Sequence, residues 1–299
     1  MSAAITALAK LCVADSADLA TGPLRLDFID FDPGVTRELR DMNGTRGKYD
    51  KDTERVRENR QTVAPRFRSE PTALELAALL PWVLGGTPSG SGAVSYPLGD
   101  ATPAKYVRFD PSAGTRWQLA GVGVGVDAMT LRASSGEPLT IDLDLVGQTH
   151  TNPVGAFPAL ALDVSTQPFI MSDAALTWNG TTRQVRDLTF SVRNNIDRTR
   201  FLNSLTLTAL NKLARQVSWG VELPSGDYDP LWDSGVAGAS LSVVFTNGGT
   251  ALTLTSPSVR FPGRNSQHPF QGEGMLRLDG EAFASGGNPS LTVTLDSTP

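Results

Sequence analysis

One stretch of the sequence recurs half a chain later. Residues 133–144 read ASSGEPLTIDLD, and residues 284–296 read ASGGNPSLTVTLD, with one residue inserted. A second pair follows in the same order, because VRFDPSAGTRWQLAG around Phe109 is echoed by VVFTNGGTALTLTS around Phe245. Repetition of this kind indicates a duplicated structural unit. The repeat therefore predicts two related domains, residues 1–150 and residues 167–299, joined by a linker over residues 151–166.

Both copies of the repeat alternate apolar and polar residues. In the second copy Leu291, Val293 and Leu295 oppose the intervening threonines, which is the period of a β-strand with one buried face. The chain also contains 29 glycines and 20 prolines among 299 residues, which is typical of many short strands joined by turns. Each domain is therefore predicted to be mainly β, with a dry face and a polar, partly acidic face on its sheet.

Three local motifs refine this prediction. Asn179 and Gly180 are the residue pair that a type I′ hairpin turn prefers, and the flanking residues alternate like strands. Thr72 and Glu75 form a capping box that predicts one helix over about residues 71–84, stopped by Gly85. The GVGVGV run at residues 121–126 has no helix after it, so we interpret it as a strand or bulge rather than a phosphate-binding loop.

The segment between Arg37 and Arg60 cannot build a core, because its acidic and basic residues are interleaved and large apolar residues are few. Two interpretations remain open. The segment is either a solvated loop or an arm that becomes ordered against a neighbouring copy of the chain. Under the second interpretation the arm residues are Arg37, Arg40, Arg46, Tyr49, Arg55, Arg57 and Arg60.

Motifs for catalysis or cofactor binding are missing from the sequence. Cys12 is the only cysteine, so an intrachain disulfide or a thiolate metal cluster is excluded. His150 and His268 have no partners at metal-ligand spacing, and we interpret both as loop residues. We therefore expect a protein that is not an enzyme, with no catalytic, metal or cofactor-binding residues and no cofactor.

Charge and hydropathy exclude two further classes of partner. The net charge of −5 and the pI near 5.1 argue against general adhesion to DNA, which requires lysine and arginine. No apolar run approaches the ~20 residues of a membrane-spanning helix. The N-terminus also differs from a secretory signal, so we expect a soluble, uncleaved chain without a membrane partner.

Three segments together resemble the major tail tube proteins of long-tailed, siphovirus-like bacteriophages. They are PFIMSDAALTWNGTTRQVRDLTFSVRNNIDRTRFLNS from Pro168, RQTVAPRFRSEPTALELAALLPWVLGG from Arg60, and GVGVGVDAMTLRASSGEPLTIDLDLVG from Gly121. The resemblance implies β-sandwich or small β-barrel domains, each with a flanking helix, and a long loop that reaches the next ring. It also implies a structural protein of the virion tail, made in the host cytoplasm, that stacks as rings into a hollow tube.

The resemblance also implies partners. The chain would bind itself and, at the tube ends, other tail proteins, while DNA passes through the lumen without specific binding. Two tube domains in each chain favour a trimeric ring with pseudo-sixfold symmetry, and a hexamer is the alternative if the repeat is not a true duplication. An acidic wall would repel the genome weakly, so the expected lumen residues are Asp142, Asp144, Asp279, Glu281 and Asp296. Alternatively, these acids simply face solvent or lie in subunit contacts.

A function of another class stays open at this stage. Two acidic-faced β domains could form a carbohydrate-binding or adhesion module, in which exposed tryptophans serve as sugar platforms. The candidates are Trp117, Trp178, Trp219 and Trp232.

Overall fold

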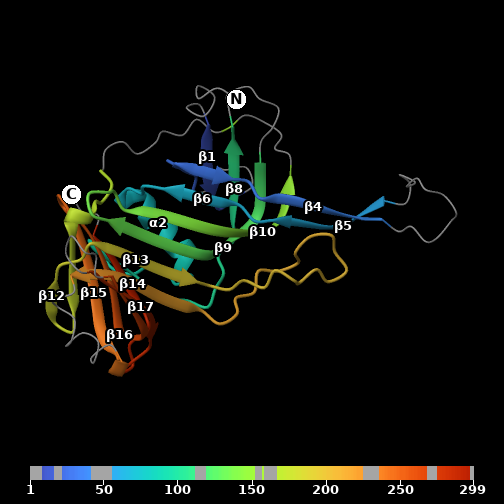
Figure 1. The fold of residues 1–299 in the computed structure, drawn as a ribbon. Coiled ribbons are helices and arrows are strands. Elements are labelled where there is room, and N and C mark those ends of the chain that lie inside the picture. Colours follow the sequence, from blue (N-terminus) through green and yellow to red (C-terminus); the bar gives the residue numbers. More distant parts are fainter. Residues whose placement is uncertain are drawn as a thin grey trace.

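The computed structural model describes residues 9–16, 22–41, 56–111, 119–151, 157, 167–224, 236–267 and 275–296. These residues are mainly β, as predicted, and their strands form one antiparallel hydrogen-bonded network (Figure 1). The first part of the chain contributes β1 (Lys10–Ala14), β2 (Leu24–Leu26), β3 (Asp30–Asp32), β4 (Val35–Asp41), β5 (Val56–Val63), β6 (Arg66–Ser69), helix α2 (Ala73–Leu84), β7 (Ala93–Tyr96), β8 (Lys105–Asp110), β9 (Leu119–Ser134) and β10 (Thr140–Thr151). The second part contributes the 3-10 turn η2 (Met171–Asp173), β11 (Ala174–Trp178), β12 (Thr181–Arg183), β13 (Asp187–Arg193), β14 (Gln216–Pro224), β15 (Ala239–Asn247), β16 (Thr250–Gln267), β17 (Met275–Phe283) and β18 (Thr292–Asp296).

Two sheets that share β16 make up most of the network, which also contains the row β2–β1–β8 beside the first part of β9 and the pair β4–β5. We call the larger of the two sheets the long sheet, in which the strands follow the order β3–β6–β10–β9–β13–β14–β17–β16. The smaller one, the short sheet, has the order β12–β11–β15–β16–β18–β7. The first part of β16 pairs with β15, and the part from Ser258 onward pairs with β17 after an irregularity in register. One strand therefore passes from one sheet into the other.

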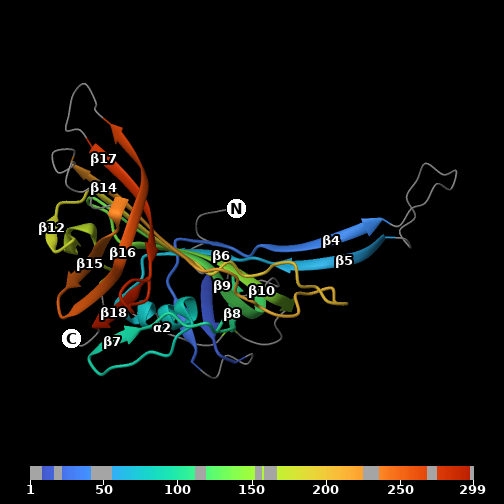
Figure 2. The same cartoon turned by 90° about the horizontal axis from the view of Figure 1, so that it is seen from below.

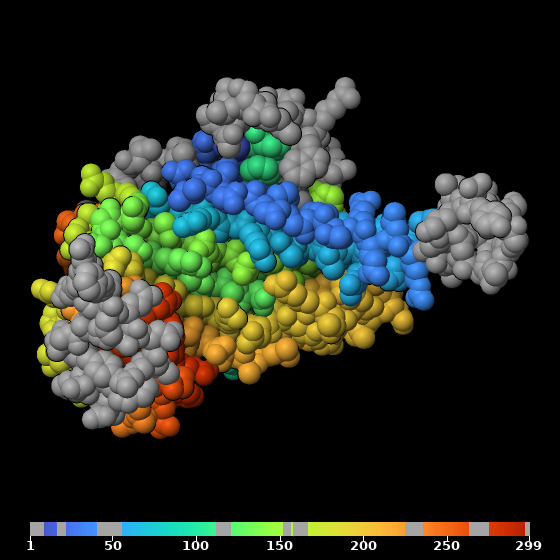
Figure 3. Space-filling view, viewed as in Figure 1, coloured from blue at the N-terminus to red at the C-terminus, as the bar shows by residue number. Residues whose placement is uncertain are grey.

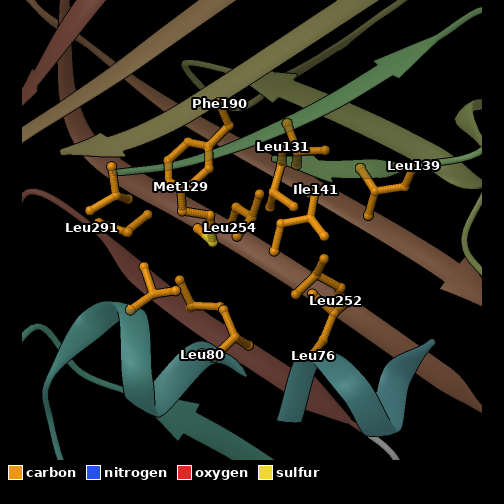
Figure 4. Close-up of a cluster of buried hydrophobic side chains, with 14 of the residues drawn as sticks. Leu76, Leu80, Met129, Leu131, Leu139, Ile141, Phe190, Leu252, Leu254 and Leu291 are labelled. Carbon is orange, nitrogen blue, oxygen red and sulfur yellow. The ribbon is translucent and has the colours of Figure 1, made fainter. Parts of the chain in front are cut away.

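The hydrophobic core lies between the long sheet, the short sheet and helix α2. Figure 4 shows Leu76 of α2 directed toward Leu252 of β16, and Leu80 on the side of Leu254 and Leu291. One continuous cluster of buried side chains runs through both sequence halves, from Leu11 to Leu295. Each fully buried side chain of this kind contributes roughly 1.5–3 kcal/mol.

Helix α2 confirms the predicted capping box. The Thr72 hydroxyl accepts the Glu75 N–H at 3.3 Å, and the Glu75 carboxylate accepts the Thr72 N–H at 3.0 Å. Gly85 ends the helix with a φ of 76°, a left-handed conformation that favours glycine. Pro81 neither shortens nor breaks the helix, which continues to Leu84.

The turn predictions are also confirmed. Asn179 and Gly180 have φ values of 46° and 79° and connect β11 to β12, as a type I′ turn requires. The GVGVGV run lies within β9, and Gly123 has a φ of 61° there. A Cβ atom on Gly123 would lie 2.1 Å from the Gln148 side-chain oxygen, so the strand needs glycine at this position.

The two copies of the repeat occupy different surroundings. The first runs from the end of β9 into β10, which pair directly across the turn. The second runs from the end of β17 into β18, and these two strands follow one another along β16. The duplication and the boundaries at residues 150 and 167 stay predictions. The described contacts tie the halves together, since β13 pairs with β9 and β18 pairs with β7.

Candidate functional site

One face of the long sheet is polar from edge to edge. Directly opposed residues of neighbouring strands point to the same side, so the strand register defines the members of this face. In Figure 3 the strands β3, β6, β10, β9 and β13 lie side by side across the molecule, from blue through green to yellow. We call this surface the polar face, and its charged residues are Asp30, Asp32, Arg66, Arg68, Arg132, Asp142, Asp144, Asp187, Arg193, Glu222, Arg260, Arg277, Asp279 and Glu281.

Alternation along each strand produces this face. Leu131, Ile141, Phe190 and Leu278 point into the core and are at most 2% exposed, while their neighbours in sequence point outward. Trp219 is also buried and donates its indole N–H to the Ser256 hydroxyl at 2.9 Å. The buried side of the sheet therefore fixes the register of the polar side, because a slip by one residue would turn the charges into the core.

Arginines and carboxylates alternate over the β6–β10–β9 part of the polar face. Arg66 lies 3.1 Å from the Asp144 carboxylate, on the neighbouring strand. Asp142 lies between two arginines, with 3.6 Å to Arg68 and 3.4 Å to Arg132. The arginine side chains are 50–74% exposed, so these pairs add little to fold stability. Their effect is on the charge that the face presents to solvent.

The β14–β17 part of the face also contains an arginine–carboxylate pair, here within one strand. Arg277 and Asp279, two residues apart on β17, approach to 3.2 Å. A Cβ atom on Gly220 of β14 would lie 2.8 Å from the Asp279 carboxylate, so glycine leaves room for this pair. Burial, a hydrogen bond with Asp187 and the charge of that neighbour raise the pKa of Glu222 above its ordinary value.

Four of the five residues predicted to line a lumen share the polar face. Asp142, Asp144, Asp279 and Glu281 lie on it, whereas Asp296 lies on β18 in the short sheet. Their assignment to a lumen stays a prediction. Sequence reasoning missed the arginines interleaved with the acids, although the alternating RFRS run of β6 carries the signal.

The described parts of the charged segment, which we predicted to be a loop or an arm, form two antiparallel strands, β4 and β5. β4 and β5 pair with each other and extend away from the body in Figures 1 and 2. Salt bridges cross this hairpin from Arg37 to Glu58 at 3.8 Å and from Arg60 to Glu38 at 3.2 Å. Of the predicted arm residues, Arg37, Arg40, Arg57 and Arg60 lie on the hairpin, while Arg46, Tyr49 and Arg55 lie outside the described residues.

The connection between β13 and β14, residues 194–215, lies beside the hairpin. The Gln61 N–H donates to the Leu205 carbonyl at 2.7 Å, and the Arg60 guanidinium lies 5.2 Å from the centre of the Phe201 ring. Leu202 and Leu205 are 64% and 50% exposed on this connection. We call β4, β5 and this connection together the arm, and sequence reasoning pointed only to the first of these segments.

The base of the arm contains a histidine that we predicted to lie in a loop. His150 lies in strand β10, and its Nδ1 atom is 3.1 Å from the Gln61 side-chain nitrogen. Burial and the nearby Arg37 guanidinium lower its pKa. The loop prediction was wrong for His150, because β10 continues to Thr151, beyond the part of the strand in which apolar and polar residues alternate. His268 lies outside the described residues.

Other candidate sites are less developed. Trp178 and Trp219 are each 1% exposed and pack in the core, so they cannot form sugar platforms. Trp117 and Trp232 lie outside the described residues.

A half-open cavity of about 450 Å³ lies between β11, β12 and β13, and its lining includes Leu176, Arg183 and Leu188. Within the described part of the chain, no three His, Cys, Asp or Glu side chains are grouped to hold a metal ion. No helix among those residues has the length and apolarity to cross a membrane.

Comparison with known proteins identifies the family. A comparison with curated proteins gave no significant match. The family model described as phage tail tube protein matches residues 13–298, which includes both sheets, the helix and the arm. A match of this extent assigns a structural role in a phage tail. The chain therefore belongs to the phage tail tube protein family.

Proposed function

We propose that copies of this chain stack as rings into the hollow tube of a phage tail, and that the polar face lines the channel through which the genome passes. The observation that carries the proposal is the polar face itself. It extends across the whole long sheet in one register, and its charges lie on the side opposite the core. Family membership supplies the tail tube context.

Free strand edges support ring formation. Among the described residues, β16 from Arg260 to Gln267 pairs only with β17, and β3 at the other side of the long sheet pairs only with β6. Unpaired edges of this kind can add a strand from another chain. Joined edge to edge, the long sheets of neighbouring copies would close into one continuous wall. Three copies with pseudo-sixfold symmetry is our preferred ring, with six copies as the alternative.

The arm supports stacking. The β4–β5 hairpin projects from the body, and the mixed charges on both its strands suit contact with complementary charges on the next ring. Other tail proteins would close the two ends of the stack. We place synthesis in the host cytoplasm and the assembled product in the virion tail.

A channel of this composition would let DNA pass without holding it. Duplex DNA carries one charge per ~1.7 Å, so free basic contacts on each ring would add up along the tube. At physiological salt the repulsion from a slightly acidic wall extends over only ~8 Å, which centres the duplex without blocking it.

Negative-stain electron microscopy of the concentrated protein tests the proposal. We expect rings or tubes, and a variant lacking residues 43–54 should keep the β fold by circular dichroism but fail to stack. Monodisperse single particles at every concentration would contradict the tube. Normal tubes from the deletion variant would contradict the role of the arm, and native mass spectrometry of the ring distinguishes three copies from six.

A further inference from the structure

The polar face contains exposed arginines that ought to bind a phosphate backbone. Arg66, Arg68 and Arg132 are 74%, 50% and 59% exposed and lie on β6 and β9, the two strands that flank β10. A guanidinium group offers five N–H donors in a planar fork that matches phosphate geometry. Three such groups on one surface, repeated in every copy, would grip duplex DNA along the length of a tube.

Each of these arginines already contacts a carboxylate. Asp144 lies 3.1 Å from Arg66, and Asp142 lies 3.6 Å from Arg68 and 3.4 Å from Arg132. The carboxylates are held in place by the strand register, since Asp142 pairs across the sheet with Arg68 and Asp144 with Arg66. A phosphate that displaced one of them would leave that carboxylate beside the negative duplex. The arginine–carboxylate pairs add little to the free energy of folding, but they change what the surface can bind.

We propose that Asp142 and Asp144 are built-in competitors of phosphate, which keep Arg66, Arg68 and Arg132 from binding a nucleic-acid backbone. The partner surface is duplex DNA, met through its phosphates and not through its bases. This inference rests on the proposed function. It adds that the wall does not hold DNA because its charges are paired, and not because of its acidity alone. The arginines in turn limit the repulsion between the acids on neighbouring strands.

Isolated subunits and a fluorescently labelled duplex of about 20 base pairs provide the test. Binding is followed by fluorescence anisotropy between 50 and 200 mM salt. The double variant D142N/D144N keeps the side-chain shapes but removes both carboxylate charges. We expect it to bind, with log K falling against log salt at a slope of up to about −2.7, because each freed arginine contributes about −0.9. Such a slope corresponds to an affinity loss of about fortyfold over this salt range.

Matched variants separate masking from net charge. D27N/E137Q changes the net charge equally, at exposed positions outside the polar face, and should bind no better than wild type. The single variant D144N removes the ion-pair partner of Arg66 alone, while Asp32 opposite Arg66 on β3 stays charged, so its slope should be at most about −0.9. Adding R66Q, R68Q and R132Q to the double variant should abolish binding again. A thermal melt of each variant verifies the fold.

The outcomes are distinct. Binding by D142N/D144N that the arginine substitutions reverse supports the proposal. Binding no stronger than that of D27N/E137Q overturns it, as does DNA binding by wild type with a slope as steep as that of the double variant. Tube formation, scored by electron microscopy in the same preparations, tests the proposed function separately. Masking in subunits that never assemble would therefore reject the tube and not the charge pairing.

Discussion

Asn194 connects the second half of the chain to the end of helix α2, and removing its side chain should destabilise the fold strongly. Asn194 is fully buried. Its amide donates to the Val83 and Val126 carbonyls, both at 2.9 Å, and its side-chain oxygen accepts the Arg215 Nε–H at 3.1 Å. Val83 lies in the last helical turn, where a carbonyl has no partner within the helix. The Asn194 amide supplies that partner.

The magnitude follows from these contacts. Asn194→Ala removes the partner of two buried carbonyls and of one charged donor. At roughly 1–2 kcal/mol for each of the three groups left without its hydrogen bond, the loss is about 3–6 kcal/mol. A folded domain has only about 5–15 kcal/mol in total. With an m-value of about 2–3 kcal/mol/M, the urea midpoint should fall by about 1–3 M.

Urea unfolding followed by tryptophan fluorescence measures this shift. Asn211→Ala is the matched control, because Asn211 lies in the same connection and its side chain makes no hydrogen bond to the described residues. The control should stay within about 0.5 kcal/mol of wild type. If Asn194→Ala also stayed within that margin, the connection would not be anchored to the helix through this side chain.

Three further predictions concern single residues. Glu75→Ala leaves two backbone N–H groups, of Asp27 and of the helix N-cap, without an acceptor in a buried site. The free energy of unfolding should therefore fall by about 2–4 kcal/mol, and by less for Glu75→Gln. An unchanged thermal midpoint would be inconsistent with the capping box. The pKa of Glu222 is raised in the folded state, so the free energy of unfolding falls as the pH rises through the titration of this carboxyl group. Glu222→Gln stays neutral and can donate to Asp187, so in urea melts it should be more stable than wild type at pH 7 but not at pH 4. Burial raises the pKa of the Cys12 thiol to about 11, so about a thousandth of the thiol is ionised at pH 8. A thiol reagent should therefore label Cys12 only after denaturant is added. Rapid labelling of the native protein would show that the strand opens.

Sequence reasoning succeeded where the signal is local. The capping box of Thr72 and Glu75 and the Asn179–Gly180 turn are decided by neighbouring residues, and both were confirmed. The alternation in β10 also placed Asp142 and Asp144 on an outward face, opposite buried apolar residues. Local propensity and two-residue periodicity therefore predicted the mainly β class and one side of the candidate site.

Features that depend on distant partners were missed. The charged residues of β4 and β5 show no burial periodicity, because the hairpin leaves the body, and their strands are defined only by mutual pairing. The partners of Asp142 come from β6 and β9, which no spacing within β10 reveals. The 194–215 connection had no sequence signal as part of an arm, since its position depends on Asn194 and on Gln61.

The pairing of β18 with β7 has a consequence for the order of events during synthesis. Val293 lies opposite Tyr96, ~200 residues earlier in the chain. At a translation rate of ~5–20 residues per second, a ribosome needs ~10–40 s to deliver the second strand after the first. The strands β16 and β17, at one edge of the long sheet, also come late. In the ring that we propose, a nascent chain would lack one of the two edges used for lateral pairing, so ring closure would have to wait until translation is nearly complete.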